Sequence, residues 1–203
     1  MSPGHHTCDD ALSVPAPGAA DVLVTRLMLH GLLGGAYRRF VDGMDLRGDE
    51  RVLDYGSGSG AVARHIAKRL AAGGGRLTCV DISPRWQRAL RRTLRGCEVV
   101  DYALGDVREL GLPEASFDVV LVHWMLHDVA GADRPSVLVA LARLLRPGGR
   151  LFIREPARPG WGAAAVALRG LLGAAGLREL RGAEGSAFFL GPNYSGVWGR
   201  PKE

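Results

Sequence analysis

Acidic side chains and two histidines stand at or near the ends of the apolar runs in this 203-residue sequence, where each run gives way to glycine or to a polar segment. The residues are Asp54, Asp81, Asp106 and Glu155, with His123, His127 and Asp128 after the most apolar run. A carboxylate accepts hydrogen bonds from ligand hydroxyl and amino groups, and an imidazole with a near-neutral pKa can act as a general base. The set therefore predicts a site that binds a polar small molecule and can move a proton.

The glycine-rich stretch 51–60 is the first of the elements that must position these groups. It begins with an apolar run typical of a buried strand and ends with Gly56, Gly58 and Gly60, and an alanine-rich amphipathic segment follows over 61–72. Glycine lets the backbone adopt positive φ, and the first turn of the following helix offers free N–H groups to a ligand. The order strand, turn, helix is typical of the first turn of a nucleotide-binding α/β sheet.

Asp54 decides between two classes of ligand for this turn. A dinucleotide lays an anionic pyrophosphate on the loop, and a carboxylate two residues before the first glycine repels it. S-adenosylmethionine has no phosphate, and a carboxylate attracts its sulfonium and ammonium groups. The glycine spacing alone does not decide, because Gly56, Gly58 and Ala61 also satisfy the looser dinucleotide pattern. With Asp54 included, the stretch resembles motif I of the class I S-adenosylmethionine-dependent methyltransferases.

Asp81 stands where the ribose of such a cofactor needs an acid. It lies about 20 residues beyond the glycine turn, near the end of a second predicted strand over 76–82, and can accept hydrogen bonds from both ribose hydroxyls. The Ser-Pro pair that follows is a better start for the next helix, which leaves the carboxylate to the ligand. Ile82 and Trp86 are placed to flank the adenine, although a Trp at that helical position is equally a core residue.

The resemblance implies further cofactor contacts. In the resembling family an acid in the turn after the third strand bonds the adenine amino group, and the next backbone N–H bonds a ring nitrogen; an Asx-turn is the alternative for that acid. The Leu-Arg-Pro-Gly-Gly pattern over 145–149, before an apolar strand, also resembles the family. The expected cofactor-binding residues are Tyr37, Asp54, Gly56, Ser57, Gly58, Gly60, Asp81, Ile82, Trp86, Gly105, Asp106, Val107, His123 and Trp124.

The pattern as a whole predicts an α/β fold: a Rossmann-like, doubly wound, seven-stranded and mostly parallel sheet with helices on both faces and an antiparallel closing strand. Further strands are expected over 98–103, 117–122 and 151–154, and further helices over 135–146 and 162–175. Segments 176–180, 187–190 and 194–198 supply the closing strands, which we expect at the antiparallel edge of the sheet.

We expect one methyltransferase domain over 21–203, preceded by a disordered tail over 1–20 that is rich in Pro, Gly and Ala. Within the domain, 21–50 forms a helical lid over the cofactor mouth, with Asp21 as its N-cap and glycines dividing it into two helices. The alternative for this region is a pair of core-packing helices.

Methyl transfer from a sulfonium needs mainly an in-line arrangement of nucleophile, methyl carbon and sulfur, and a general base helps when the nucleophile is a hydroxyl or a carbon acid. The candidates, all expected at the carboxyl edge of the sheet, are His127, His123, Asp128 and Glu155. Capping or a structural bond with Asp128 is the alternative for His127, and packing beside the cofactor is the alternative for His123.

The resemblance implies methylation of an O, N or C atom of a small-molecule acceptor, as in ubiquinone biosynthesis and secondary metabolism. A cyclase that binds the cofactor without spending its methyl, and a non-catalytic cofactor-binding subunit, are the alternatives. His123-Trp124 stands where methylases of DNA bases carry Asn/Asp-Pro-Pro-Tyr, so no nucleic-acid partner is expected.

The composition bounds the rest of the prediction. The net charge is +5, and its one cluster, five arginines over 85–95, reads as a solvated helix face or as a contact with an anionic surface. Three cysteines without CxxC spacing indicate reduced thiols and a cytoplasmic protein. We expect no metal site and no membrane span, and a homodimer stays open.

Overall fold

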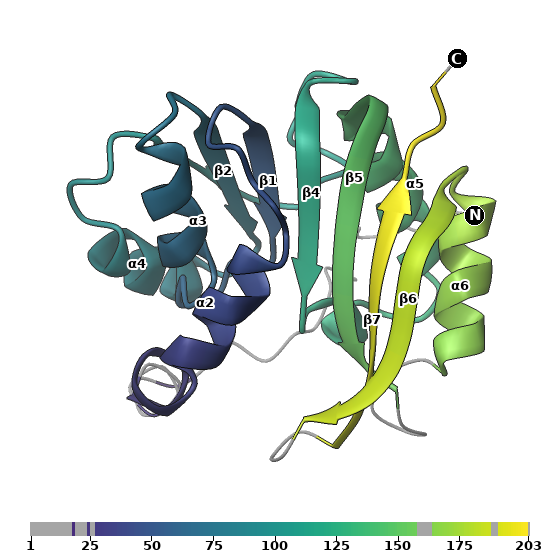
Figure 1. Cartoon of the computed structure of the whole chain (residues 1–203), viewed down its shortest axis with the longest axis horizontal. Coiled ribbons are helices and arrows are strands. Elements are labelled where there is room, and N and C mark those ends of the chain that lie inside the picture. The colour runs from purple at the N-terminus through teal and green to yellow at the C-terminus, as the bar shows by residue number, and fades with distance from the viewer. Residues whose placement is uncertain (1–17, 19–23, 25–26, 158–163, 188–190, 203) are drawn as a thin grey trace, which may run out of the picture.

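Seven strands of the described chain form one sheet in the order β3-β2-β1-β4-β5-β7-β6 (Figure 1). The structure is a computed structural model that describes residues 18, 24, 27–157, 164–187 and 191–202. The strands are β1 Arg51–Tyr55, β2 Arg76–Asp81, β3 Val100–Leu104, β4 Phe117–His123, β5 Leu145–Pro156, β6 Arg178–Ala187 and β7 Gly191–Gly199. The helices are η1 Leu27–Leu32, α2 Gly34–Asp42, α3 Ala63–Leu70, α4 Pro84–Thr93, η2 Leu126–Asp128, α5 Arg134–Leu144 and α6 Ala165–Ala174.

The strand directions confirm the predicted fold class. Strands β1 to β5 pair in parallel, and β7 pairs antiparallel with both β5 and β6. The closing strands form this edge of the sheet as expected, with the antiparallel strand β7 beside β5 and β6 outermost. Of the expected strand over 187–190, Ala187 is the last residue of β6, and 188–190 lie outside the described residues. Strands β6 and β7 pair antiparallel along most of their length.

Helices cover both faces of the sheet. In Figure 1, α2, α3 and α4 lie on one side and α5 and α6 on the other. The first side has its own buried apolar cluster, which includes Val41, Ile66 and Leu90, and the second side has another, which includes Leu138 and Leu168. Strand β4 is buried on both faces, as its near-continuous apolar run predicts for a central parallel strand.

The Pro-Gly-Gly turn that the sequence predicts lies within β5. The register of β5 against β4 skips residues 146–149, which loop out of the ladder. Gly148 has a φ of 77°, a left-handed conformation that favours glycine, and its N–H donates to the carbonyl of Arg200. The turn thus ties the start of β5 to the C-terminal segment.

The region over 21–44 contains two helices in its described part, η1 and α2, as predicted. The Nε2 atom of His30 lies 3.2 Å from the hydroxyl of Ser59 in the glycine turn, and Arg64 donates a hydrogen bond to the carbonyl of His30. Tyr37 of α2 is buried in the apolar cluster on that face. The expected tail over 1–20, apart from Gly18, and the expected cap at Asp21 lie outside the described residues.

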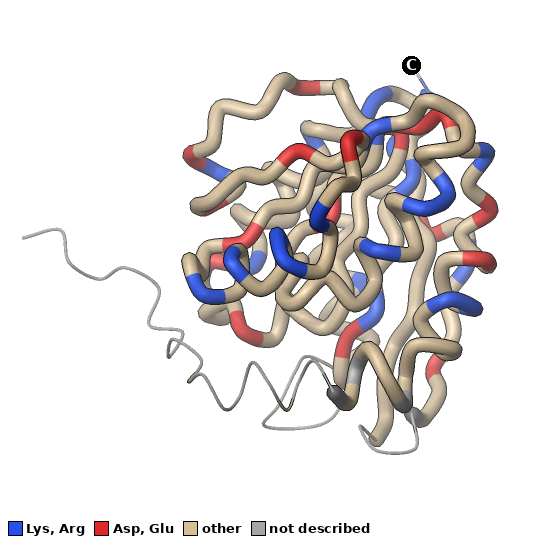
Figure 2. Tube along the Cα trace, turned by 90° about the vertical axis from the view of Figure 1, so that its left-hand side faces the viewer, with Lys and Arg blue, Asp and Glu red and all other residues tan. Residues whose placement is uncertain are grey.

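Charged residues are spread over the molecule. Figure 2 shows Lys and Arg interspersed with Asp and Glu along the trace. In the arginine-rich helix α4, Arg91 lies over the ring of Tyr102, with 4.2 Å between its guanidinium carbon and the ring centroid. Within the described residues, no helix is long and apolar enough to cross a membrane, and no group of three His, Cys, Asp or Glu side chains is arranged to hold a metal ion.

Candidate cofactor and active site

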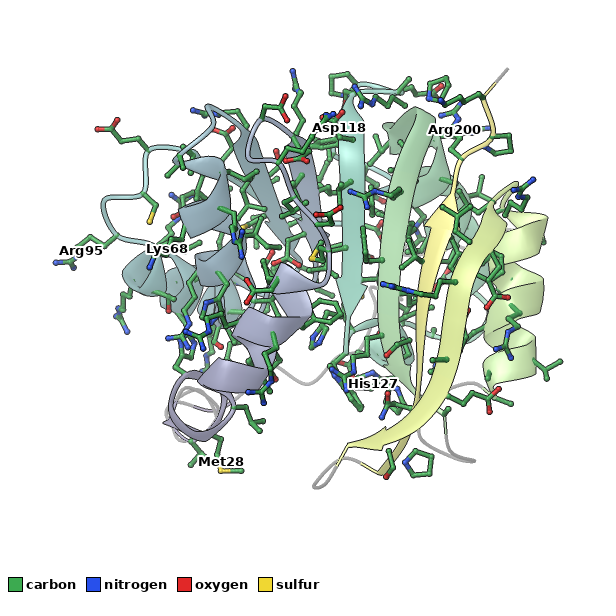
Figure 3. The ribbon with its side chains drawn as sticks, viewed as in Figure 1. Met28, Lys68, Arg95, Asp118, His127 and Arg200 are labelled. Carbon is green, nitrogen blue, oxygen red and sulfur yellow. The ribbon has the colours of Figure 1, made fainter. Side chains whose placement is uncertain are left out.

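The predicted site residues gather at the carboxyl edge of the parallel strands. Strands β1, β2, β4 and β5 run in the same direction, so the residues at their carboxyl ends meet at one edge of the sheet. Figure 3 shows His127 at the end of β4 on this edge. Ligands of open α/β sheets bind outside this edge, at the point where the strand order reverses, and here the order reverses between β1 and β4.

The glycine turn after β1 depends on glycine for two different reasons. Gly56, Gly58 and Gly60 have φ values of 75°, 52° and 83°, which L side chains rarely adopt. At Gly56 there is also no room, because a Cβ atom would lie 1.9 Å from Cγ of Met125. At Gly58 the nearest atom would be 3.9 Å away, so only the backbone conformation favours glycine there. Ser57 is buried, and its hydroxyl donates to the carbonyl of Asp54.

Asp54 is a buried carboxylate at the end of β1. Its exposed fraction is 3%, and burial raises the pKa of its carboxyl from 3.8 to about 7, against a lowering by the Ser57 hydroxyl and with a further rise from the charge of Asp81. A carboxylate so far from water is costly to ionise unless a cation lies beside it. Asp54 is therefore suited to meet a positively charged ligand group.

Asp81 ends β2 and holds the glycine turn. One carboxylate oxygen accepts the N–H of Gly58 at 2.9 Å, and the other accepts the N–H of Ser83 at 2.8 Å. The pKa of Asp81 is raised overall, because the effect of burial exceeds the lowering by these two hydrogen bonds. A carboxylate has about four acceptor positions, so it can still accept bonds from ligand hydroxyls. Ile82 and Trp86 beside it are half-buried, and Trp86 is thus not a fully buried core residue.

The turn after β3 has the geometry of an Asx-turn, which the sequence left open as the alternative to adenine binding for Asp106. Asp106 accepts the N–H of Arg108 at 2.8 Å, and its other oxygen lies 2.7 Å from the Arg108 guanidinium. These contacts lower the pKa of Asp106, above all through the side-chain hydrogen bond. The sequence did not reveal Arg108, which also pairs with Asp133. Gly105 and Val107 flank the acid, and its contact with an adenine stays a prediction.

Glu155 near the end of β5 and His127 in η2 form a buried pair at the carboxyl edge of the sheet. Four hydrogen bonds end on the Glu155 carboxylate: the N–H groups of Met125 at 2.8 Å, Leu126 at 2.9 Å and His127 at 3.2 Å, and Nδ1 of His127 at 2.9 Å. The contacts fill its acceptor capacity and cap the helical turn η2. This geometry favours a positioning role for Glu155 over the role of a base.

His127 has a raised pKa despite its burial. Burial alone lowers it, but the hydrogen bond and the charge of Glu155, with the charge of Asp128, raise it overall. Its Nε2 atom lies 3.5 Å from a carboxylate oxygen of Asp128, which is exposed at the edge. An imidazole that is held at Nδ1 by a carboxylate presents Nε2 in a defined orientation. The contact with Asp128, which was the alternative for His127, is present, and the role of His127 as a base stays a prediction.

His123 lies among aromatic rings at the end of β4. Its ring centroid is 5.4 Å from that of Tyr37 and 4.9 Å from that of Phe40. Burial, and then the charge of Arg154, lower the pKa of His123 to about 3, so it is a weak base near neutral pH. Trp124 follows with a φ of 53°, a strained conformation of the kind found at functional sites, which the sequence did not predict.

Comparisons with known proteins identify the family. Residues 53–153 match the methyltransferase domain family. The chain is 34% identical over 136 residues to a demethylmenaquinone methyltransferase of Tropheryma whipplei. The matched stretch covers 66% of this chain and 54% of the relative. It is 36% identical over 124 residues to a nocamycin O-methyltransferase of Saccharothrix syringae, with 60% and 43% covered. The chain thus spans about half the length of the curated relatives it matches.

Solved structures share the fold at low identity. A methyltransferase of Bacillus halodurans that is described as putative superposes with a TM-score of 0.71 at 15% identity, over 83% of this chain and 100% of the other. The [4+2]-cyclase SpnF superposes with a TM-score of 0.71 at 18% identity, over 93% of this chain and 99% of the other. These likenesses concern the fold, whereas the family model matches the stretch that holds the glycine turn, Asp81, Asp106 and His127. The chain therefore belongs to the class I S-adenosylmethionine-dependent methyltransferases.

Proposed function

We propose that this protein transfers the methyl group of S-adenosylmethionine to an O, N or C atom of a small-molecule acceptor. The observation that carries the proposal is Asp54, a carboxylate with an exposed fraction of 3% at the carboxyl end of β1, beside the glycine turn. A cofactor that carries an ammonium and a sulfonium supplies the positive charge that this buried acid needs.

The residues present fit that cofactor. Asp54 would face the ammonium, and Asp81, with acceptor positions left beyond its bonds to Gly58 and Ser83, would receive the ribose hydroxyls. The half-buried Ile82 and Trp86 would flank the adenine. When bound, S-adenosylmethionine supplies a methyl group that is already activated by the positive charge on sulfur. The protein then has to position the acceptor and exclude water.

We assign the general base to His127. Its Nε2 atom would take the proton of an acceptor hydroxyl or carbon acid, and the Glu155 carboxylate, 2.9 Å from Nδ1, stabilises the resulting imidazolium. Asp128 modulates the same imidazole from 3.5 Å. His123 has a low pKa, so in this scheme it is a packing residue beside the cofactor, which is the alternative role that the sequence left open for it.

We also infer that the region over 21–50 acts as a lid. Its described part contacts the glycine turn through His30 and Ser59, and Tyr37 of α2 lies against His123 at the end of β4. A segment that touches both the turn and the strand end is placed to close over a ligand at this edge.

The relative of Saccharothrix syringae is an O-methyltransferase by name, and a further relative, of Psychromonas ingrahamii and 30% identical over 127 residues, is a C-methyltransferase of ubiquinone/menaquinone biosynthesis by name. These names do not settle the acceptor of this chain. The test is a product assay for S-adenosylhomocysteine over a panel of phenols, quinols, amines and hydroxylated aromatic acids, with calorimetric titration of S-adenosylmethionine and NAD. We expect S-adenosylmethionine binding, no NAD binding and product with at least one acceptor. Cofactor binding with an acceptor that is converted but not methylated would instead favour a cyclase-like activity.

A further inference from the structure

Arg154 of β5 lies at the carboxyl edge, and its side chain has no partner among the described residues. It pairs in register with His123 on β4 and with Ser195 on β7. It lies on the same face of β5 as Phe152, because side chains alternate along a strand, and this is the face that α2 covers. Within the described residues its guanidinium makes no hydrogen bond or ion pair, and its Nε atom is buried.

Two other partly buried arginines of the structure are each paired with two acids, in contrast to Arg154. Arg108 pairs with Asp106 and Asp133, and Arg169 pairs with Glu179 and Glu184. Arg154 instead acts on neutral or basic neighbours: its charge lowers the pKa of His123 and opposes the rise in the pKa of Tyr37. Arg154 is half-buried with its Nε atom buried and unbonded, and a guanidinium in this setting matches the fork of a carboxylate in a bound ligand.

The cofactor carboxylate is not well placed to meet this arginine. That carboxylate shares a carbon with the ammonium group, which we assign to Asp54 on β1. Strand β4 separates β1 from β5, and Arg154 lies two residues beyond the register position of Asp54, so their backbones are about 12 Å apart at the usual strand spacing and rise. An acceptor that reaches the proposed base His127, which follows β4 and is held by Glu155 of β5, is the better partner.

The surroundings of Arg154 indicate what kind of acceptor this is. The side chain shares its face of the sheet with an aromatic group in which the ring centroid of His123 lies 5.4 Å from that of Tyr37 and 4.9 Å from that of Phe40. A flat ring packs against such a group, and the buried Nε2 of His123, which has no hydrogen-bond partner within the described residues, adds a polar contact. We propose that Arg154 selects a planar aromatic acceptor that carries a carboxylate.

This inference deepens the proposed function and rests on it, because the bound ligand is a methyl acceptor only if the protein is a methyltransferase. Its test also measures ligand binding, which does not require turnover. Matched pairs of hydroxylated benzoates and their amides serve as probes, both as substrates and as ligands titrated into the complex with S-adenosylhomocysteine. We expect the acid of a pair to bind more tightly. In Arg154→Gln its affinity should fall by about 10- to 100-fold, the range for loss of a charge-assisted hydrogen bond, while the amide should be little affected.

Arg150→Gln is the matched control, because it removes the same charge from the same face at the other end of the paired part of β5. It should leave the preference for acids unchanged, and Arg154→Lys should restore part of it. Three outcomes would overturn the inference: amides that bind as well as acids, a preference that survives in Arg154→Gln, or a loss confined to cofactor affinity, which would assign Arg154 to the cofactor. If acids bind through Arg154 and no panel member is methylated, the proposed function fails and the anion site stands.

Discussion

Replacing Asp54 by Asn should stabilise the cofactor-free protein while it weakens cofactor binding. The pKa of Asp54 is raised from 3.8 to about 7, chiefly by burial. Because the folded state binds this proton more tightly than the unfolded state, the contribution of Asp54 to stability falls as the pH rises from about 4 to 7 and is constant above. A shift of about 3 units corresponds to about 4 kcal/mol in favour of the neutral side chain above pH 7.

The expected net gain is smaller than this figure. A buried amide without full hydrogen bonding costs about 1 to 3 kcal/mol, which leaves a gain of roughly 1 to 3 kcal/mol at pH 8.5. For a chain of this size the melting temperature should rise by about 2 to 4 °C per kcal/mol. The gain should shrink towards pH 4, where wild-type Asp54 is neutral in the folded state and only partly ionised in the unfolded state.

The assay is thermal unfolding of both proteins between pH 4.5 and 8.5, with calorimetric titration of S-adenosylmethionine. Wild-type affinity should increase as the pH rises towards 7, because the cofactor needs the ionised carboxylate, and Asp54→Asn should lose this dependence and most of the affinity. Asp101→Asn, on the exposed part of β3, is the charge-matched control. A variant no more stable than wild type at pH 8.5, with undiminished cofactor affinity, would refute the reasoning.

Three further predictions test the other parts of the site. Asp81→Asn should weaken cofactor binding by about 10-fold or more, since each hydrogen bond to a charged group contributes roughly 1.5–3 kcal/mol; an unchanged dissociation constant in calorimetry would place the ribose elsewhere. His127→Ala should lower turnover by roughly 10²-fold with near-normal cofactor affinity. Because the neutral imidazole is the base and its pKa is raised above 6.5, wild-type turnover should increase with pH through that pKa, and Glu155→Gln should move the inflection to lower pH; a flat profile in wild type would contradict this role. Gly56→Ala should cost more stability in chemical unfolding than Gly58→Ala, which should lose about 1–2 kcal/mol from its left-handed backbone alone; equal losses would show that packing over Gly56 is not tight.

Local chemistry made much of the cofactor side readable from the sequence. The apolar run before Gly56, the alternating glycines and the amphipathic segment after them specify a strand, a tight turn and a helix through short-range preferences. Asp81 followed from its distance along the chain, because a strand-helix-strand unit has a nearly constant length. The Ser83 cap, whose hydroxyl accepts the N–H of Trp86, is likewise a local feature.

Tertiary structure alone decided which polar groups meet. Glu155 caps a turn about 30 residues away in the chain, and Asp133 pairs with Arg108 across 25 residues, although nothing in the spacing of these residues indicates such contacts. The isolation of Arg154 is likewise visible only once the described neighbours are in place. Hydrogen-bond and ion-pair partners are set by the packing of distant segments, and so is the place of β7 between β5 and β6. The sequence alone therefore determined the order of elements and the residue types at the edge of the sheet, whereas the fold decided which of those residues hold one another and which are left for a ligand.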